Sequence, residues 1–420
     1  MIDLRKEPFE KAVLVALKTQ KVTRDTVDEH LDELEELAAT AGAVAVKKYV
    51  QDRSGYDSAY FIGTGKVEEI KQYCEDNNIN LVIFDDDLSP VQLRNLEKAI
   101  NKKIVDRSAL ILDIFAKHAS TNEAKTQVEL AQLLYYLPRL TRQWTHLSKQ
   151  YAGVGTKGPG ETQIETDRRL VRDRIAILRQ RLKKIEGQRE TQTARRKEVL
   201  RISFVGYTNA GKSTLFNLLT GAGILAEDRL FATLDSTTRT LQLENSVQAI
   251  ISDTVGFIRK LPHHLVASFR STLREVREAD IILHIIDASH PFFEDHIQVV
   301  DETLKGLECD TKPVIKVFNK IDKLDNTAEL EYIRQNYDLS VSLSAATGLN
   351  VHALLEMISE LATSGFAEET ATLPIEKSFL ISRIRGMADI LEEIYLDTGV
   401  TLRYRVSNAN LEIVRNILHG

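Results

Sequence analysis

The sequence predicts an α/β fold in which a doubly wound, mostly parallel sheet follows a smaller α/β unit with a helical hairpin and precedes a small C-terminal α/β unit. Short β-branched runs such as 281–287 alternate with helix-like segments, and glycine-containing turns separate them. The 420 residues also exceed what one hydrophobic core usually supports. We therefore expect domains at 1–122, 123–196, 197–365 and 372–420.

The composition is that of a globular protein, with 43% hydrophobic and 28% charged residues. Cys74 and Cys309 are the only cysteines, which argues against a disulfide framework or a thiolate metal site. The first residues lack a secretory signal pattern, and no run reaches the roughly 18 apolar residues of a membrane-spanning helix. We expect a cytoplasmic protein that does not insert into membranes and that acts as a monomer.

The first domain is expected to alternate strands and helices. Its expected strands are 12–17, 43–50, 81–87 and 103–106, and its expected helices are 27–38, 66–78 and 89–100. Gly42 is suited to end the first of these helices. Ser89 is a typical N-cap residue, and the proline after it suits the first turn of a helix.

The second domain reads as two helices that pack as an antiparallel hairpin. Leucines form a stripe over 126–148, which Pro138 should interrupt, and apolar residues at spacings of four and three form a seam over 165–190. The seam residues are Val171, Ile175, Leu178, Leu182 and Ile185. Between the helices, the glycine-rich loop 153–160 should project.

Charge is concentrated in this hairpin. The net charge of the chain is −6, yet residues 168–197 hold twelve Lys or Arg against three acids. Such a run is often only a solvated helix face. The excess is larger than pairing with three acids can use, so we favour contact with RNA phosphates.

The large sheet is expected to contain one antiparallel pair near its start. Its expected strands are 199–205, 240–245, 247–253, 281–287, 313–319 and 339–345. After a loose connector at 363–374, the segments 377–384 and 401–407 alternate with helices expected at 388–397 and 409–420.

The stretch GYTNAGKS, 206–213, matches the phosphate-binding pattern G-x-x-x-x-G-K-[ST] between a strand and a helix. Gly206 and Gly211 let the backbone approach phosphates, and the helix N-terminus adds its dipole. Lys212 should reach the β and γ phosphates, and Ser213 should ligate Mg²⁺. The alternative is an ordinary glycine-rich turn.

Three later motifs decide between these interpretations. Asp253 in DTVG ends a strand, where it can hold Mg²⁺ through water, while the amide of Gly256 meets the γ phosphate. Asp322 in NKID can accept from N1–H and the 2-amino group of guanine, a donor pair that adenine lacks. The backbone of Ser344 to Ala346 suits the guanine oxygen. Together they predict a P-loop GTPase domain over 197–365.

A switch segment is expected at 231–239, between the phosphate loop and DTVG. Thr233 is the preferred second hydroxyl ligand of Mg²⁺, with Thr237 and Thr238 as weaker candidates. The alternative is that all three are turn residues. We expect Lys212, Thr233 and Gly256 to take part in catalysis.

The predicted GTP site is a set of loop residues from four segments. It comprises Gly206, Tyr207, Thr208, Asn209, Ala210, Gly211, Lys212, Ser213, Thr214, Phe231, Ala232, Thr233, Leu234, Asp235, Asp253, Thr254, Val255, Gly256, Asn319, Lys320, Ile321, Asp322, Ser344, Ala345 and Ala346. Ser213, Thr233 and, through water, Asp253 are the predicted Mg²⁺ ligands.

With these motifs beside SAYFIGTGKVEEI (58–70), QVELAQLLYYLPRL (127–140) and GTKGPGETQIETDRRL (155–170), the chain resembles the HflX family of GTPases over essentially its whole length. The resemblance implies binding to the large ribosomal subunit and a role in splitting or rescuing stalled ribosomes, particularly under stress. It also implies that loop 153–160 reaches ribosomal RNA. Lys157 stands where the family usually has Arg, which keeps the charge but loses a planar fork. The expected RNA contacts are Lys157, Arg168, Arg169, Arg172 and Arg179.

Many GTPases place a Gln after the DxxG glycine to orient the attacking water, whereas this chain has Phe257. We therefore expect slow hydrolysis alone and faster hydrolysis on the ribosome. Asn209 stands where, in some such GTPases, Asn helps hold K⁺ against the phosphates; the alternative is that it only satisfies the loop.

Two further functions remain open from the sequence. One is a GTP/GDP-switched RNA-binding or scaffold protein with negligible turnover. The other adds ATP-dependent RNA remodelling by the N-terminal domain, for which the phrase GTGK (63–66) is the support, although a simple helix start is the favoured reading. The histidines, including His263, His264 and His290, have no metal-ligand partners at useful spacing and are expected to be structural or on the surface.

Overall fold

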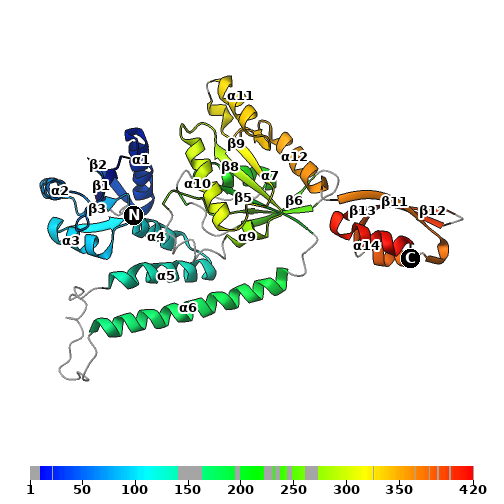
Figure 1. The fold of residues 1–420 in the computed structure, drawn as a ribbon, viewed down its shortest axis with the longest axis horizontal. Helices are drawn as coiled ribbons and strands as arrows, with labels where there is room; N and C mark the ends of the chain where they lie inside the picture. Colours follow the sequence, from blue (N-terminus) through cyan, green and yellow to red (C-terminus); the bar gives the residue numbers. More distant parts are fainter. Residues whose placement is uncertain are drawn as a thin grey trace, which may run out of the picture.

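The computed structural model describes residues 10–20, 22–140, 163–193, 199–221, 230–231, 237–243, 248–260, 273–324, 326–364, 366–377, 379–385, 387–396 and 399–419. Within these ranges the strands form three separate sheets (Figure 1). The domain limits expected from the sequence stay a prediction. Below, N-terminal region means residues 10–118 and GTPase region means residues 200–364.

The N-terminal region is a parallel four-stranded sheet in the order β2-β1-β3-β4 with helices around it. Its elements are β1 (Glu10–Lys18), α1 (Arg24–Ala41), β2 (Ala43–Asp52), α2 (Thr64–Asp76), β3 (Leu81–Phe84), α3 (Pro90–Ile100), β4 (Lys103–Asp106) and α4 (Arg107–His118). Gly42 ends α1 in the left-handed conformation, with φ of 93°. Ser89 and Gln92 form a capping box at the start of α3. Both helix ends were predicted from the sequence.

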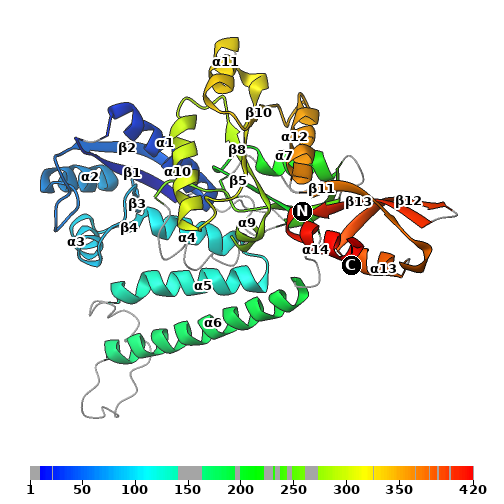
Figure 2. The same cartoon turned by 45° about the vertical axis from the view of Figure 1, so that its right-hand side comes forward.

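The hairpin consists of α5 (Asn122–Tyr136) and the long α6 (Gln163–Thr193), which lie side by side below the N-terminal region in both views (Figures 1 and 2). Pro138 lies in the short 3₁₀ helix Leu137–Arg139, so the proline does end α5 as expected. Leu130 packs against Ile175 and Leu178, which belong to the predicted seam. Loop 153–160 lies outside the described residues.

The GTPase region is a six-stranded sheet in the order β10-β9-β8-β5-β7-β6. All neighbouring strands are parallel except β6 and β7, which form the expected antiparallel pair. Its elements are β5 (Leu200–Gly206), α7 (Lys212–Thr220), β6 (Thr237–Gln242), β7 (Gln248–Asp253), α9 (Arg274–Glu278), β8 (Ile281–Asp287), α10 (Phe293–Gly306), β9 (Val314–Asn319), α11 (Thr327–Asn336), β10 (Ser340–Ser342) and α12 (Val351–Ser364). The nearly continuous burial of β8 is typical of a central parallel strand.

The C-terminal part departs from three expectations. The helix expected at 388–397 is wrong, because Ala388–Leu396 is strand β12, which pairs with β13 (Gly399–Ser407). The loose connector expected at 363–374 is also wrong, because Phe366–Leu373 is strand β11 on the other side of β13. Pairing with β13 provides hydrogen-bond partners for the backbone N–H and C=O groups of β11 and β12. This pairing outweighs the helix propensity of Leu and Glu. The strand expected at 377–384, in alternation with helices, is wrong as well, because Leu380–Ile384 is helix α13. Helix α14 (Asn408–His419) completes the part.

The N-terminal and GTPase regions share one hydrophobic core. Phe115 of α4 lies edge to face with Phe231, at 4.6 Å between ring centroids. The same cluster of buried residues joins Leu31 and Leu34 of α1 with Val255, Phe257 and other residues of the GTPase region. Among the described helices, none combines the length and apolar character that crossing a membrane requires.

Candidate nucleotide site

The phosphate loop lies between the end of β5 and the start of α7. Gly206 has φ of 154°, and a Cβ there would lie 2.2 Å from the carbonyl oxygen of Ile285. Gly211 has φ of 93°, and a Cβ there would lie 2.2 Å from the side-chain nitrogen of Asn319. Only glycine fits these two positions. Gly211 gives α7 no side-chain cap, which is typical of a helix N-terminus that receives an anion.

Lys212 lies inside this loop. Its Nζ donates to the carbonyl oxygens of Gly206 at 3.1 Å and Tyr207 at 2.7 Å. Burial lowers the pKa of Lys212 to about 8, although the carboxylate of Asp253 acts in the opposite direction. The ammonium is therefore costly to keep charged in this place, and an anion beside it would relieve that cost.

Ser213 and Asp253 meet at the start of α7 as a magnesium site would require. Ser213 Oγ donates to Asp253 Oδ2 at 2.7 Å. Asp253 is fully buried, and its Oδ1 has no hydrogen-bond partner in the described part of the chain. Burial raises the pKa of this carboxyl. A buried carboxylate oxygen without a donor, beside a hydroxyl, fits a hydrated Mg²⁺ ion.

The expected switch segment is described only in part. Ala232, Thr233, Leu234 and Asp235 lie outside the described residues, so the preferred Mg²⁺ ligand Thr233 stays a prediction. Thr237 is the first residue of β6 and pairs in register with Asp253, and Thr238 next to it is exposed.

Asn319 joins the phosphate loop to the segment expected to contact guanine. Its Nδ2 donates to the carbonyl oxygen of Ala210 at 2.9 Å, and its Oδ1 accepts from the backbone N–H of Ala345 at 2.8 Å. Lys320 Nζ lies 2.7 Å from Asp287 Oδ2 at the end of β8. Asp322 is exposed, which leaves its carboxylate accessible to a ligand. Asp322 lies in the short 3₁₀ helix Ile321–Lys323, which Ile321 begins.

Other predicted residues have structural contacts. Thr254 Oγ1 donates to the carbonyl oxygen of Phe204 at 2.6 Å, which ties β7 to β5. Ser344 is fully buried, and its Oγ accepts from the N–H of Thr347 at 3.2 Å. Val255 is buried, Ala346 is exposed, and Thr214 lies in the first turn of α7.

The DTVG segment is hydrogen-bonded to the phosphate loop. The N–H of Phe257 donates to the oxygen of Gly206 at 3.0 Å, and the N–H of Thr208 donates to the oxygen of Phe257 at 2.8 Å. A Cβ at Gly256 would lie 2.8 Å from Thr208 Cγ2 and 3.0 Å from Lys212 Nζ. A movement of either segment must therefore affect the other.

Comparison with known proteins agrees with this geometry. Three family models match the chain: GTP-binding GTPase N-terminal over 28–116, GTP-binding GTPase middle region over 118–196, and 50S ribosome-binding GTPase over 201–320. GTPase HflX of Escherichia coli is 42% identical over 406 residues, which cover 96% of this chain and 95% of that protein. This chain belongs to the HflX GTPase family.

Further relatives have the same name. GTPase HflX of Flavobacterium psychrophilum is 52% identical over 314 residues, or 75% of this chain and 76% of that protein. Among solved structures, a GTP-binding protein from Sulfolobus solfataricus in complex with GDP is 26% identical, with a TM-score of 0.45, and covers 84% of this chain and 99% of its own. The family and the fold class predicted from the sequence are confirmed. This HflX GTPase binds GTP and hydrolyses it, and P-loop GTPases generally use Mg²⁺.

A buried ionic network between the two regions was not predicted. Tyr207 of the phosphate loop donates its hydroxyl hydrogen to Glu33 of α1 and accepts from the backbone N–H of Arg259 at 3.1 Å. Arg107 donates to Glu33 at 2.6 Å and to Asp85 at 2.7 Å. Burial beside the Glu33 carboxylate raises the pKa of the Tyr207 hydroxyl well above its ordinary value.

The same network continues into the residues after DTVG. Arg259 Nη1 donates to Glu29 at 3.0 Å, and Lys260 Nζ donates to Asp85 and Asp86, each at 2.6 Å. The N-terminal region thus contacts both the phosphate loop, at Tyr207, and the residues that follow DTVG, at Arg259 and Lys260. The acidic run 85–87 is the one sequence signal for this network, and its partners Arg107 and Lys260 lie 22 and 175 residues from Asp85.

Two weaker expectations have structural outcomes. In GTGK, Lys66 pairs with Glu69 at 2.5 Å, and the N–H of Gly63 donates to Gln51, which supports the simple helix start. On α6, Arg169 is exposed, as are Arg172 and Arg179, whereas Arg168 is half-buried and donates to the carbonyl oxygen of Leu140 at 2.8 Å. Lys157 lies outside the described residues.

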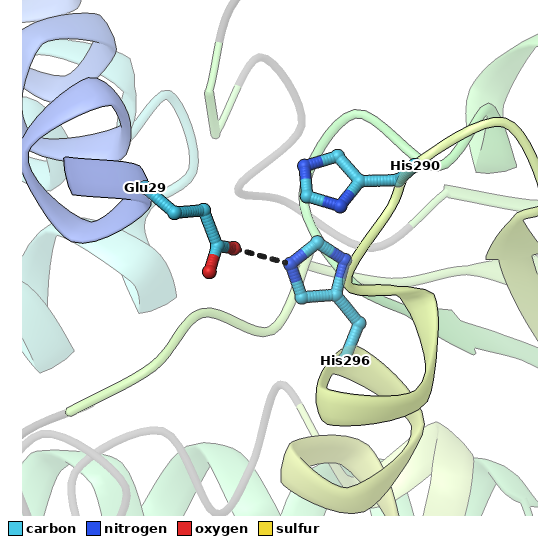
Figure 3. Close-up of side chains that lie close together, drawn as sticks. All are labelled: Glu29, His290 and His296. Carbon is cyan, nitrogen blue, oxygen red and sulfur yellow. Dashed lines mark ion pairs between the residues drawn. The ribbon is translucent and has the colours of Figure 1, made fainter. Parts of the chain in front are cut away.

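The expectation that His290 is structural or on the surface stays a prediction, and the structure adds two neighbours to it. His290, which follows β8, lies beside His296 of α10 and Glu29 of α1 (Figure 3). Sequence spacing did not reveal this group because Glu29 comes from another region of the chain. His263 and His264 lie outside the described residues.

Proposed function

We propose that this HflX GTPase binds the large ribosomal subunit in the cytoplasm and helps to split or rescue stalled ribosomes, with GTP hydrolysis stimulated by the ribosome. The observation that carries the proposal is the match of residues 201–320 to a family model described as 50S ribosome-binding GTPase. A protein that acts on the ribosome needs an RNA-binding surface in addition to its nucleotide site, and the hairpin supplies a suitable one.

The basic face of α6 is the proposed RNA surface. Arg172 and Arg179 are exposed and lie seven residues apart, which places them on the same side of the helix. Exposed guanidinium groups suit phosphate oxygens because they offer planar pairs of donors. Loop 153–160, including Lys157, is proposed to extend this surface. Arg168 and Arg169 complete the proposed set.

The phosphate site suggests how the nucleotide is held. We propose that Lys212 neutralises the β and γ phosphates, that Asp322 recognises guanine, and that the amide of Gly256 contacts the γ phosphate. Ser213, Thr233 and, through water, Asp253 would hold Mg²⁺, which neutralises charge on the phosphates when it is bound.

Phe257 supports slow hydrolysis by the protein alone. Its side chain is 3% exposed, and it has no amide or carboxylate to orient water. A ribosome that reorders the DTVG segment would change this geometry. We therefore expect multiple-turnover phosphate release to rise strongly when large subunits are added, and equal rates with and without subunits would contradict stimulation.

Sedimentation of 70S ribosomes tests the proposal. With GTP or a non-hydrolysable analogue, we expect the protein to convert 70S particles into separate subunits and to migrate with the large one, whereas GDP should not support this. The double variant Arg172→Glu, Arg179→Glu should lose subunit binding while its GDP affinity stays the same, because neither side chain is near the nucleotide site. Splitting in the presence of GDP, or unchanged binding of the double variant, would contradict the proposal.

The second candidate function is a GTP/GDP-switched RNA-binding or scaffold protein with low turnover. The backbone bridge between Phe257 and the phosphate loop favours it, because the bridge holds DTVG in one place. The two functions differ in phosphate release with large subunits, which a scaffold does not accelerate.

Two further proposals concern the nucleotides and ions used. If Asn209 helps hold K⁺, hydrolysis in K⁺ should exceed hydrolysis in Na⁺, and equal rates would remove this role. If the N-terminal region remodels RNA with ATP, Lys212→Ala should keep an ATPase activity. The pairing of Lys66 with Glu69 speaks against that activity.

A further inference from the structure

The cluster Glu29, His290 and His296 lies where the N-terminal region meets the GTPase region, outside the nucleotide site. Each of the three residues offers one ligand atom, and these atoms all lie within 4.8 Å of one another. Figure 3 shows the carboxylate of Glu29 reaching from α1 toward the two imidazole rings, which come from the start of α10 and the loop before it. The side chains of Glu29 and His296 are each 11% exposed, and His290 is partly buried.

We propose that these three side chains form a binding site for a transition-metal ion of the Zn²⁺ type that links α1 to α10. Two imidazoles and one carboxylate are ligands that Zn²⁺, Co²⁺ and Ni²⁺ accept readily, whereas Mg²⁺ and Ca²⁺ prefer oxygen ligands alone. Three protein ligands leave one position of a tetrahedral ion for water.

The distance between two of the ligand atoms already suits such an ion. His296 Nε2 lies 3.4 Å from Glu29 Oε1. In a tetrahedral site with bonds of about 2.0–2.1 Å, neighbouring ligand atoms are roughly 3.3–3.4 Å apart. The carboxylate and the first imidazole therefore need little movement to bind the same ion, and His290 completes the site by a side-chain rotation toward them.

Neighbouring groups orient two of the ligands. Arg259 Nη1 donates to Glu29 Oε2 at 3.0 Å, which leaves Oε1 directed at the imidazoles. The ring of His296 stacks on that of Tyr207 at 3.8 Å between centroids and an angle of 6°. Such outer contacts are what fix ligand orientation in metal sites.

His290 gives up one contact when it binds a metal. Its Nδ1 accepts from the backbone N–H of Phe292 at 3.2 Å, so coordination through either ring nitrogen exchanges this neutral hydrogen bond for a metal bond. For this reason, we expect reversible binding with a micromolar dissociation constant, weaker than that of structural zinc sites.

The site has a consequence for the phosphate loop. His296 covers the ring of Tyr207, whose hydroxyl group is bound to Glu33. An ion held by α1 and α10 together would tie the N-terminal region to the GTPase region directly beside this residue. Metal binding should therefore stabilise the contact between the two regions.

A titration tests the site: Zn²⁺ is added to the full chain in a solution that already contains excess Mg²⁺ and GDP. The excess Mg²⁺ and GDP occupy the nucleotide site, so that Zn²⁺ there does not contribute. We expect one equivalent to bind and to raise the melting temperature. We also expect one equivalent of Co²⁺ to give the visible absorption of a four-coordinate ion with nitrogen ligands.

Substitutions locate the ion. His290→Ala, His296→Gln and Glu29→Gln should each weaken Zn²⁺ binding by at least about tenfold. His352→Ala is the matched control, because His352 lies beside Glu356 on the surface of α12, far from the cluster in sequence. His290→Ala is the mildest variant, and unchanged GDP binding shows that it folds. The proposal is overturned if the wild-type chain binds no Zn²⁺ in this assay, or if the three cluster variants bind it as tightly as the control.

Discussion

Replacing Arg107 by methionine tests how strongly the N-terminal region depends on its buried charges. The Arg107 side chain is 2% exposed and reaches Glu33, Asp85 and the carbonyl oxygen of Arg259. Methionine keeps much of the apolar volume of the arginine side chain, but the buried carboxylates of Glu33 and Asp85 each lose one cationic partner. Removing one partner of a buried ion pair costs about 3–5 kcal/mol. Arg259 still reaches Glu33 and Lys260 still reaches Asp85 in this variant. We therefore expect the free energy of unfolding to fall by about 3 kcal/mol, the lower end of that range.

Calorimetry of the full chain with GDP measures this loss. At roughly 2–4 °C for each kcal/mol, the melting temperature of the unit that contains Arg107 should fall by about 6–12 °C. Arg174→Met is the matched control. Like Arg107, Arg174 donates to two carboxylate oxygens, here both of Glu129, but its side chain is 49% exposed. We expect the control to unfold almost as the wild type does. A loss at Arg107→Met no larger than that of the control would refute this reasoning.

Three further predictions concern the nucleotide and the hairpin. Gly256→Ala places a methyl group against Thr208 and Lys212. Overpacking of about 1–3 kcal/mol should lower the rate of phosphate release by roughly 5- to 150-fold, with GDP affinity retained. An unchanged rate would show that the two segments are not in contact. Since Lys212 has its pKa lowered to about 8, GTP affinity should be constant below that pH and fall as the pH rises above it, by up to about tenfold per unit, because binding must then take up a proton. Titrations from neutral to alkaline pH measure this, and Lys212→Arg should remove the dependence, since its guanidinium group stays charged. Neutralising Arg172 and Arg179 should lower the slope of log affinity for ribosomal RNA against log salt, by up to about one for each lost phosphate contact; an unchanged slope would place RNA elsewhere.

The nucleotide site was predictable because its signals are local. Gly206, Lys212 and Ser213 lie within eight residues, and the geometry of a strand, a tight loop and a helix fixes how they face a phosphate. Asp253 and Asn319 end strands that run parallel within one sheet, so the carboxyl ends of those strands bring them to the same edge. Topology alone was enough to assemble them.

The contacts between the two regions were not predictable by the same means. Glu33 and Tyr207 are 174 residues apart, and no sequence motif around either residue indicates that the two are in contact. The cluster of Glu29 with His290 and His296 has the same origin, because it exists only once α1 packs beside α10. Single charged or histidine residues have no spacing from which a distant partner can be inferred.

The C-terminal error has a different cause. Residues 388–397 contain two Leu and two Glu, which favour helices in isolation. The structure pairs Ile390 with Tyr404 and Glu393 with Leu402 instead, so the neighbouring strand decides the conformation. Strand propensity depends on such partners more than helix propensity does.

The central claim is that a guanine nucleotide occupies the loop from Gly206 to Ser213 and is recognised by Asp322. Exchanging that carboxylate for an amide tests it most directly. The carboxylate of Asp322 suits the two N–H donors of guanine, whereas Asn offers a donor to the 2-oxo group of xanthine. We predict that the wild type prefers GTP over ATP and XTP by at least about 100-fold, and that Asp322→Asn shifts the preference from GTP toward XTP. Equal affinity of the wild type for GTP and ATP, or a GTP-to-XTP ratio unchanged by Asp322→Asn, would contradict the claim.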